Sequence, residues 1–200
     1  MVLEIIGARY LAKDFGGSFY VWTSQIGVIL IALALGYAIG GWLADRFQKA
    51  AFLSWLLIPT GLLVFLIPVY APRLVEAIVM RHPPDEDIPM IWQKLDPAIG
   101  SALIFLLPCF VLATLGPYMI RLSTRHVSHV GRVSGLIYAA STVGSILGVF
   151  ISGYVLIDQM KLSTIFQATG GLVAALGGMT LLMDRWMKDE EATREGGGAD

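Results

Sequence analysis

The chain has 200 residues, of which 56% are hydrophobic and 14% charged, with a formal net charge of −1. A soluble domain typically has about 25% charged residues, so this composition excludes an ordinary water-soluble fold and predicts a membrane protein. The near-neutral charge argues against nucleic-acid binding, which needs a clustered basic face, and the single cysteine, Cys109, excludes a disulfide framework.

Residues 1–13, MVLEIIGARYLAK, have a helical pattern but are too short to cross a bilayer. A bilayer core of about 30 Å needs about 20 apolar helical residues. We therefore expect an all-α, polytopic helical membrane protein with five full spans after a partial first helix, all within a single transmembrane domain over 1–183. The five charge-free segments that meet this length are 20–44, 51–71, 97–120, 133–157 and 162–183.

The connections between the spans predict two sides. Segment 72–96 is the one long predicted loop, and it contains the acidic run DED at 85–87. Segments 45–50 and 121–132 are short and rich in arginine and lysine, which places them on the cytoplasmic side of an inner, cytoplasmic-type membrane by the positive-inside rule. The charged segment 184–200 is expected on the same side, as a disordered cytoplasmic tail.

Small residues recur every four positions in three of the predicted spans, which places them along one stripe of each helix. Helices in lipid gain little from the hydrophobic effect and associate where small residues let their backbones approach. We interpret these ladders as helix-packing faces; the alternative is that the missing side chains make room for a ligand. The ladders are Ala32, Gly36, Gly40 and Ala44; Ala140, Gly144, Gly148 and Ser152; and Gly170, Ala174 and Gly178.

Polar side chains near or within the spans are candidates for a cavity or a solute site. Glu4 and Arg9 carry the most weight, because ionisable groups at membrane depth are costly and usually functional; the alternative is that both lie at the membrane interface. The further candidates are Gln25, Tyr37, Tyr138 and Ser141. No nucleophile with a base and no metal-ligand constellation is present, so we expect a non-enzymatic protein without catalytic residues, cofactor or metal.

The segment GWLADRFQK contains Gly41, Asp45, Arg46 and Lys49. Their order resembles the loop between the second and third helices of the major facilitator superfamily. The alternative interpretation is an ordinary charged stop at a helix end.

Two longer stretches extend this resemblance over nearly the whole of residues 3–157. LEIIGARYLAKDFGGSFYVWTSQIGVILIALALGYAIGGWLADR and GRVSGLIYAASTVGSILGVFISGYVLI resemble the membrane region of spermidine-synthase-like transmembrane proteins. In that family a major-facilitator-like helical region usually precedes a soluble aminopropyltransferase-like domain, which has no counterpart in these 200 residues. The resemblance implies a major-facilitator-like six-helix half, built as two inverted three-helix units.

Two functions follow as expectations. The first is binding or transport of a small polar or cationic solute, with a polyamine implied by the resemblance alone. A half of this kind needs a second copy, as a homodimer, or a membrane partner subunit to enclose a cavity. The alternative is a membrane anchor or scaffold for a soluble synthase (a separately encoded aminopropyltransferase) or for another membrane complex. The lipid bilayer is a partner in either case.

Overall fold

The computed structural model describes residues 1–17, 19–47, 49–83, 88–124 and 130–196. Within these ranges the chain is helical and contains no strand. The helices are α1 (Val2–Phe15), α2 (Phe19–Arg46), α3 (Ala50–Val79), α4 (Met90–Ser101), α5 (Leu107–Ser123), α6 (Val130–Phe150), α7 (Ile157–Gln159) and α8 (Leu162–Gly196), with π-helical segments η1 (Ala102–Leu106) and η3 (Ile151–Leu156).

Five helical stretches are long and apolar enough to cross a membrane. They are Phe19–Arg46, Ala51–Val79, Met90–Ser123, Val130–Gln159 and Leu162–Leu182. Two of them continue through the π-helical segments η1 and η3. Helix α1 has 14 residues and a length of about 21 Å, which is too short to cross. The predicted all-α fold, with five spans and a short first helix, is confirmed.

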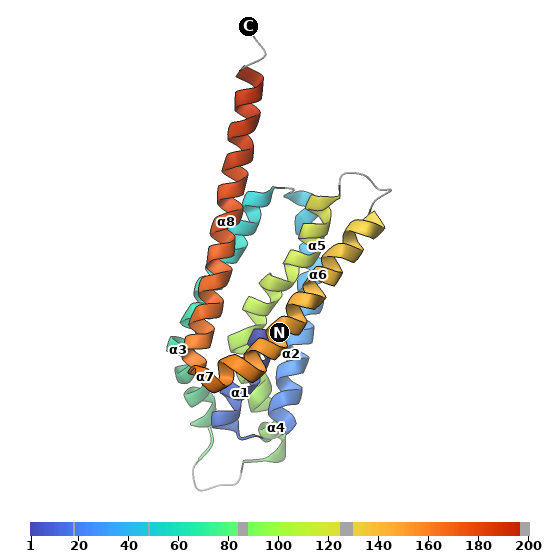
Figure 1. The fold of residues 1–200 in the computed structure, drawn as a ribbon. Coiled ribbons are helices and arrows are strands. Elements are labelled where there is room, and N and C mark those ends of the chain that lie inside the picture. The colour runs from blue at the N-terminus through green and yellow to red at the C-terminus, as the bar shows by residue number, and fades with distance from the viewer. Residues whose placement is uncertain (18, 48, 84–87, 125–129, 197–200) are drawn as a thin grey trace.

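The ends of the long helices gather at two opposite ends of the bundle. In Figure 1, the end of α2, the start of α3, the end of α5 and the start of α6 lie at the end beyond which α8 projects, and the end of α3, the start of α4 and the α7–α8 turn lie toward the other end. The cytoplasmic placement of segments 45–50 and 121–132 stays a prediction.

The prediction of a long loop at 72–96 is wrong, because most of this segment is helical. Helix α3 continues to Val79, and α4 begins at Met90. Pro72 removes one backbone hydrogen bond from α3, but the helical period of apolar side chains continues through it and buries Val75 and Ile78. The acidic run at 85–87 lies outside the described residues.

The predicted disordered tail 184–200 is also corrected, because α8 continues as a helix to Gly196. Charged composition favoured disorder, but glutamate, lysine, arginine and alanine are also good helix formers. The sequence also spaces opposite charges four apart, at Asp184 and Lys188 and at Glu190 and Arg194, an arrangement that supports a helix. Residues 197–200 lie outside the described part of the chain.

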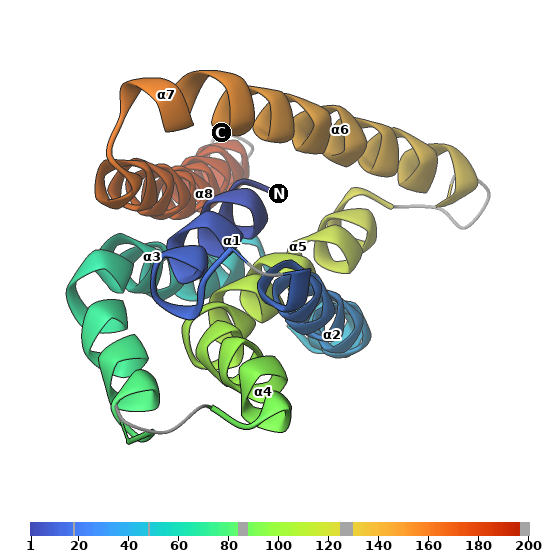
Figure 2. The same ribbon diagram turned by 90° about the horizontal axis from the view of Figure 1, so that it is seen from below.

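Helix α1 lies inside the bundle, although it does not span it (Figure 2). Ile6 and Leu11 are fully buried and belong to one apolar core with Phe105 and Phe166. The rings of these two phenylalanines stack with centroids 6.0 Å apart. The core therefore encloses α1 between the longer helices.

Helices α3 and α8 pack through a direct contact of their backbones. A Cβ atom added to Gly170 would lie 2.4 Å from the backbone nitrogen of Phe65 and 2.5 Å from the carbonyl oxygen of Gly61. One added to Gly61 would lie 2.6 Å from the carbonyl oxygen of Gly170. Both positions therefore have to be glycine for the two helices to lie this close.

The predicted ladder on α8 needs one correction. A Cβ atom added to Gly177 would lie 2.9 Å from side-chain atoms of Leu57 and Ile58, whereas nothing lies within 4 Å of one added to Gly178. A helix turns by about 100° per residue. A side chain at Gly177, seven residues after Gly170, therefore points within about 20° of one at Gly170, and a side chain at Gly178 points about 80° away. Gly177, and not Gly178, therefore shares the packing face of Gly170.

Helices α2 and α5 form the second close pair. Ala32, Gly36, Gly40 and Ala44 are all buried. A Cβ atom added to Gly36 would lie 2.5 Å from the Phe110 carbonyl oxygen, and one added to Gly40 would lie 2.7 Å from the Cα of Thr114. The α2 ladder thus faces α5.

Helix α6 lies on the outside of the bundle (Figure 2), and none of its described side chains is fully buried. Ala140 and Gly144 of the second ladder are exposed, and nothing lies within 4 Å of a Cβ atom added to Gly144. Farther along, a Cβ atom added to Gly148 would lie 3.5 Å from the side chain of Val2, and Ser152 is buried. Within this chain, the first half of the α6 ladder does not pack against a helix.

We expect Gly170→Ala to destabilise the protein by about 1–3 kcal/mol, because the new methyl group would push α8 away from α3. The matched control is Gly171→Ala, where nothing lies within 4 Å of the added atom. Alanine at that position should leave stability unchanged or raise it by up to about 1 kcal/mol, through its better helix propensity. Thermal unfolding in detergent measures both, and equal melting temperatures for the two variants would contradict the α3–α8 contact.

Candidate solute cavity

A cavity of about 380 Å³ lies between α1, α2, α5 and α6 and reaches α8. Four of the six predicted cavity residues line it: Glu4 from α1, Tyr37 from α2, and Tyr138 and Ser141 from α6. The structure therefore brings together side chains that lie up to 137 residues apart in the sequence.

Glu4 places a carboxylate in a largely apolar wall. The first turn of α1 carries it, and the N-terminus lies about halfway along the long helices in Figure 1. Leu33, Leu112 and Ile137 are among the apolar residues that line the same cavity. No lysine, arginine or histidine of the described residues lies within ion-pair distance of the Glu4 carboxylate. An unpaired charge in an apolar setting is unfavourable, and a counter-charge would stabilise it.

Tyrosine, serine and threonine side chains form part of the cavity lining. Tyr37 from α2 and Tyr138 from α6 line the cavity and are 50% and 59% exposed. Ser141 and Ser145 line the cavity from α6. Thr169 reaches it from α8, but its hydroxyl donates to the carbonyl oxygen of Ile165, 2.8 Å away.

The other two predicted cavity residues lie elsewhere. Arg9 is exposed on α1 and does not line the cavity. Gln25 is buried with 1% exposure and accepts a hydrogen bond of 2.5 Å from the Ser101 hydroxyl at its Oε1. Among the described residues its Nε2 has no hydrogen-bond partner, and it lies against Gly7, where a Cβ atom would come within 2.5 Å. Gln25 therefore joins α2 to α4 inside the core, because Gly7 leaves room for its amide.

The predicted loop motif forms contacts at the end of α2. Asp45 accepts a 2.9 Å hydrogen bond from the Nε of Arg121 on α5, and the Arg46 guanidinium lies 6.0 Å from the ring centre of Trp42. Both charged side chains are exposed. Gly41 has nothing within 4 Å of an added Cβ atom, so close packing does not require glycine there.

The fully buried Tyr118 makes a contact that the sequence did not predict. Its hydroxyl lies within hydrogen-bond distance of the carbonyl oxygens of Phe47 (2.8 Å) and Lys49 (3.0 Å). It therefore fastens the turn between α2 and α3 to α5. An isolated tyrosine near a helix end gave no indication of this partner.

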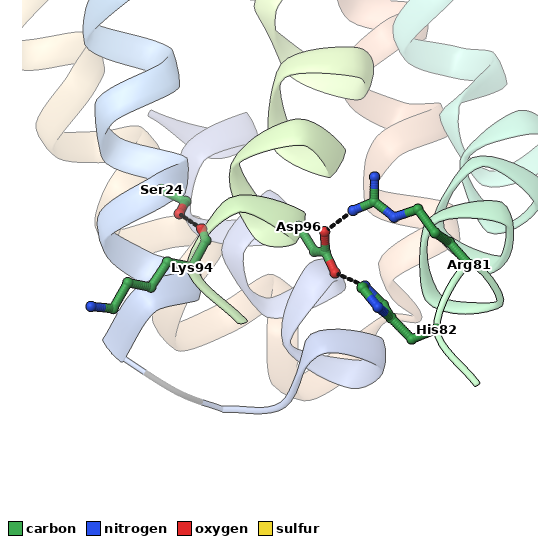
Figure 3. A network of polar contacts seen from close by, with 5 residues as sticks. All are labelled: Ser24, Arg81, His82, Lys94 and Asp96. Carbon is green, nitrogen blue, oxygen red and sulfur yellow. Dashed lines mark hydrogen bonds and ion pairs between the residues drawn. The ribbon is translucent and has the colours of Figure 1, made fainter. Parts of the chain in front are cut away.

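A second missed cluster lies at the opposite end of the bundle, around Asp96 of α4 (Figure 3). Asp96 is only 4% exposed; one carboxylate oxygen accepts from the guanidinium of Arg81, and the other lies 2.7 Å from the Nε2 of His82. The Arg81 guanidinium also lies 4.2 Å from the ring centre of Trp92. Arg81 and His82 follow the end of α3, so this cluster joins the ends of α3 and α4. Arg81 and His82 lie 15 and 14 residues before Asp96. This spacing matches no short motif, so the sequence did not indicate the cluster.

Another cavity, of about 490 Å³, lies between α1, α3 and the start of α8. Lys13, Asp14 and Glu76 line it, and all three are exposed. Burial raises the pKa of Tyr10 in its wall, and the negative charge of Asp14 raises that pKa further. Asp14 and Glu76 are exposed, whereas Glu4 is only partly exposed.

No group of three or more potential metal-ligating side chains occurs among the described residues. Comparisons with protein-family models, with curated proteins and with solved structures find no match for this chain.

Proposed function

We propose that this integral membrane protein is non-enzymatic and binds a small organic cation in the cavity beside Glu4, as one step of its passage across the membrane. The observation that carries the proposal is a carboxylate in a largely apolar cavity, with no lysine, arginine or histidine side chain of the described residues within ion-pair distance. A cationic solute would supply the missing counter-charge.

The remaining lining suits an organic cation better than a metal ion. Metal ions such as Ca²⁺ take six or more oxygen ligands, whereas this cavity offers one carboxylate and a few hydroxyl groups. Tyrosine rings attract organic cations through their π faces, and the apolar walls suit a hydrocarbon body. The resemblance to spermidine-synthase-like membrane regions adds a polyamine as a candidate solute.

We further propose that a second copy of the chain covers the open side of the cavity, forming a homodimer. The exposed residues Tyr37, Tyr138 and Gly144 lie on the two helices that border this side. A glycine without a neighbour in its own chain permits the backbone of another helix to approach closely. A different membrane subunit at this face is the alternative outcome.

We expect Gly144→Leu to weaken the dimer, because leucine would hold the two α6 helices apart. The fold should persist, since the position is open within the chain. Gly171→Leu is the control, because α8 is also open there. Sedimentation in matched detergent measures the oligomer, and an unchanged dimer in the Gly144→Leu variant would exclude this interface.

Uptake by reconstituted vesicles tests the transport proposal. Radiolabelled butylammonium and putrescine are offered separately to vesicles that contain the full chain. We expect uptake of at least one of them, and we expect Glu4→Gln to reduce it by at least about tenfold, because the neutral amide of the same size cannot offset the charge of the solute.

Glu76→Gln is the control, since Glu76 lines the other cavity, and it should leave uptake unchanged. Uptake that survives Glu4→Gln would place the path elsewhere. Vesicles that take up neither cation would contradict the proposed transport.

The scaffold function is the second candidate, and it has one observation in its favour. Helix α8 continues past the end of its span at Leu182 to Gly196, and Figure 1 shows it projecting beyond the other helices. The part after Leu182 is about 20 Å long, enough to reach from the membrane into the aqueous phase. A chain inactive in the uptake assay that still retains a soluble synthase on the membrane through this helix would favour the scaffold.

A further inference from the structure

We propose that the cavity between α1, α3 and the start of α8 binds the headgroup of phosphatidylethanolamine, a phospholipid that carries a phosphate and a primary ammonium. The structure brings one lysine and two carboxylates together there, beside an apolar wall. This cavity shares no lining residue with the one beside Glu4, so the proposal is independent of the proposed transport.

Charged side chains of both signs line this cavity. Lys13 and Asp14 come from the last turn of α1, and Glu76 comes from the last turn of α3. None of the three forms an ion pair with another of the described residues. Opposite charges that share a cavity without pairing suit a ligand that itself has both charges. A zwitterionic headgroup is such a ligand.

Lys13 supplies the main contact for the phosphate. A lysine ammonium binds phosphate oxygens as a point charge, and the hydroxyl groups of Tyr10 and Ser163, which line the same cavity, are further donors. Ser163 is the second residue of α8, where the backbone N–H has no carbonyl partner within the helix. The phosphate therefore meets one positive charge and several neutral donors.

Asp14 and Glu76 supply the acceptors for the ammonium. A primary ammonium has three N–H donors, and the two carboxylates can accept them in charge-assisted hydrogen bonds. Both side chains are exposed, so each contact contributes less than a buried one would. The expected selectivity is therefore moderate.

The cavity runs along α3 from the end of the bundle toward its middle. Glu76 lies three residues before the end of the α3 span at Val79, where lipid headgroups meet water. Pro68 lies eight residues earlier, about 12 Å farther along the helix, and it also lines the cavity. A soluble zwitterion would leave this apolar length unfilled, whereas a phospholipid would place its glycerol and first methylene groups there. The depth of the cavity therefore favours the lipid.

The ammonium distinguishes this lipid from other phospholipids. Phosphatidylcholine has a methylated ammonium, which has no N–H to donate to Asp14 or Glu76. Phosphatidylglycerol has no ammonium, and its negative charge would enter a cavity lined by two carboxylates and one lysine. Both lipids should bind more weakly than phosphatidylethanolamine.

Native mass spectrometry of the full chain in detergent measures the bound lipid directly. The delipidated protein is titrated with phosphatidylethanolamine, phosphatidylcholine and phosphatidylglycerol of identical acyl chains. We expect the first lipid to bind at least about fivefold more tightly than either of the others. Glycerophosphoethanolamine, the same headgroup without acyl chains, should not displace it at equal concentration.

Substitutions at the charged positions test the location of the site. Asp14→Asn/Glu76→Gln should abolish the preference for phosphatidylethanolamine, and Lys13→Gln should weaken its binding by at least about threefold. All three positions are exposed, so the fold should persist, which thermal unfolding checks. The matched controls are Arg9→Gln and Asp158→Asn, at exposed positions outside this cavity. Both should keep the preference.

The outcomes separate this proposal from the proposed function. Equal binding of the three lipids by the unsubstituted chain would overturn it without any variant. A preference that survives both sets of substitutions would place the lipid elsewhere and also overturn it. Displacement by an equal concentration of glycerophosphoethanolamine would identify a soluble zwitterion in place of the lipid. Glu4→Gln should leave the lipid preference unchanged, so a failure of the transport proposal would leave this one standing.

Discussion

The backbone contact between Gly61 and Gly170 fixes how closely α3 and α8 lie, and the rest of the bundle depends on it. Hydrocarbon chains are as apolar as leucine, so helices in lipid gain little by burying apolar side chains against each other. They gain from close packing, and glycine allows it. The Gly36 and Gly40 contacts of α2 with α5 follow the same principle, and α1 lies between the two helix pairs.

The cavity exists because α6 lies outside this frame. Its described side chains are not fully buried, and it contacts α5 as well as the N-terminal end of α1, where Gly148 and Ser152 lie. The space left beside that end of α1 contains Glu4. Two tightly packed helix pairs and the more exposed α6 therefore form the walls of this cavity.

Much of the frame could be predicted from sequence, because hydropathy over about 20 residues reports membrane spans directly. The ends were harder: Pro72 and the charges after Met183 are typical of helix ends, yet helical periodicity and propensity extend α3 and α8 past them. Within the site, Glu4, Tyr37, Tyr138 and Ser141 were predictable as polar groups in apolar segments. Sequence alone could not distinguish Gln25 from these cavity residues, because its burial in the core depends on Gly7 of another helix. The partners of Asp96 and Tyr118 lie at helix ends whose meeting depends on the packing of the bundle.

The most direct test of the frame is a disulfide between α3 and α8 in membrane vesicles. The hydroxyl oxygens of Ser54 and Thr180 are 2.8 Å apart, so the sulfur atoms of cysteines at these positions would lie close together. With Cys109→Ala in the background, we predict rapid oxidation of the Ser54→Cys/Thr180→Cys pair and slow oxidation of Ser54→Cys/Met179→Cys, as counted by mass spectrometry of alkylated thiols. Equal rates for the two pairs, or no oxidation of the first, would contradict the register that the glycine contact sets.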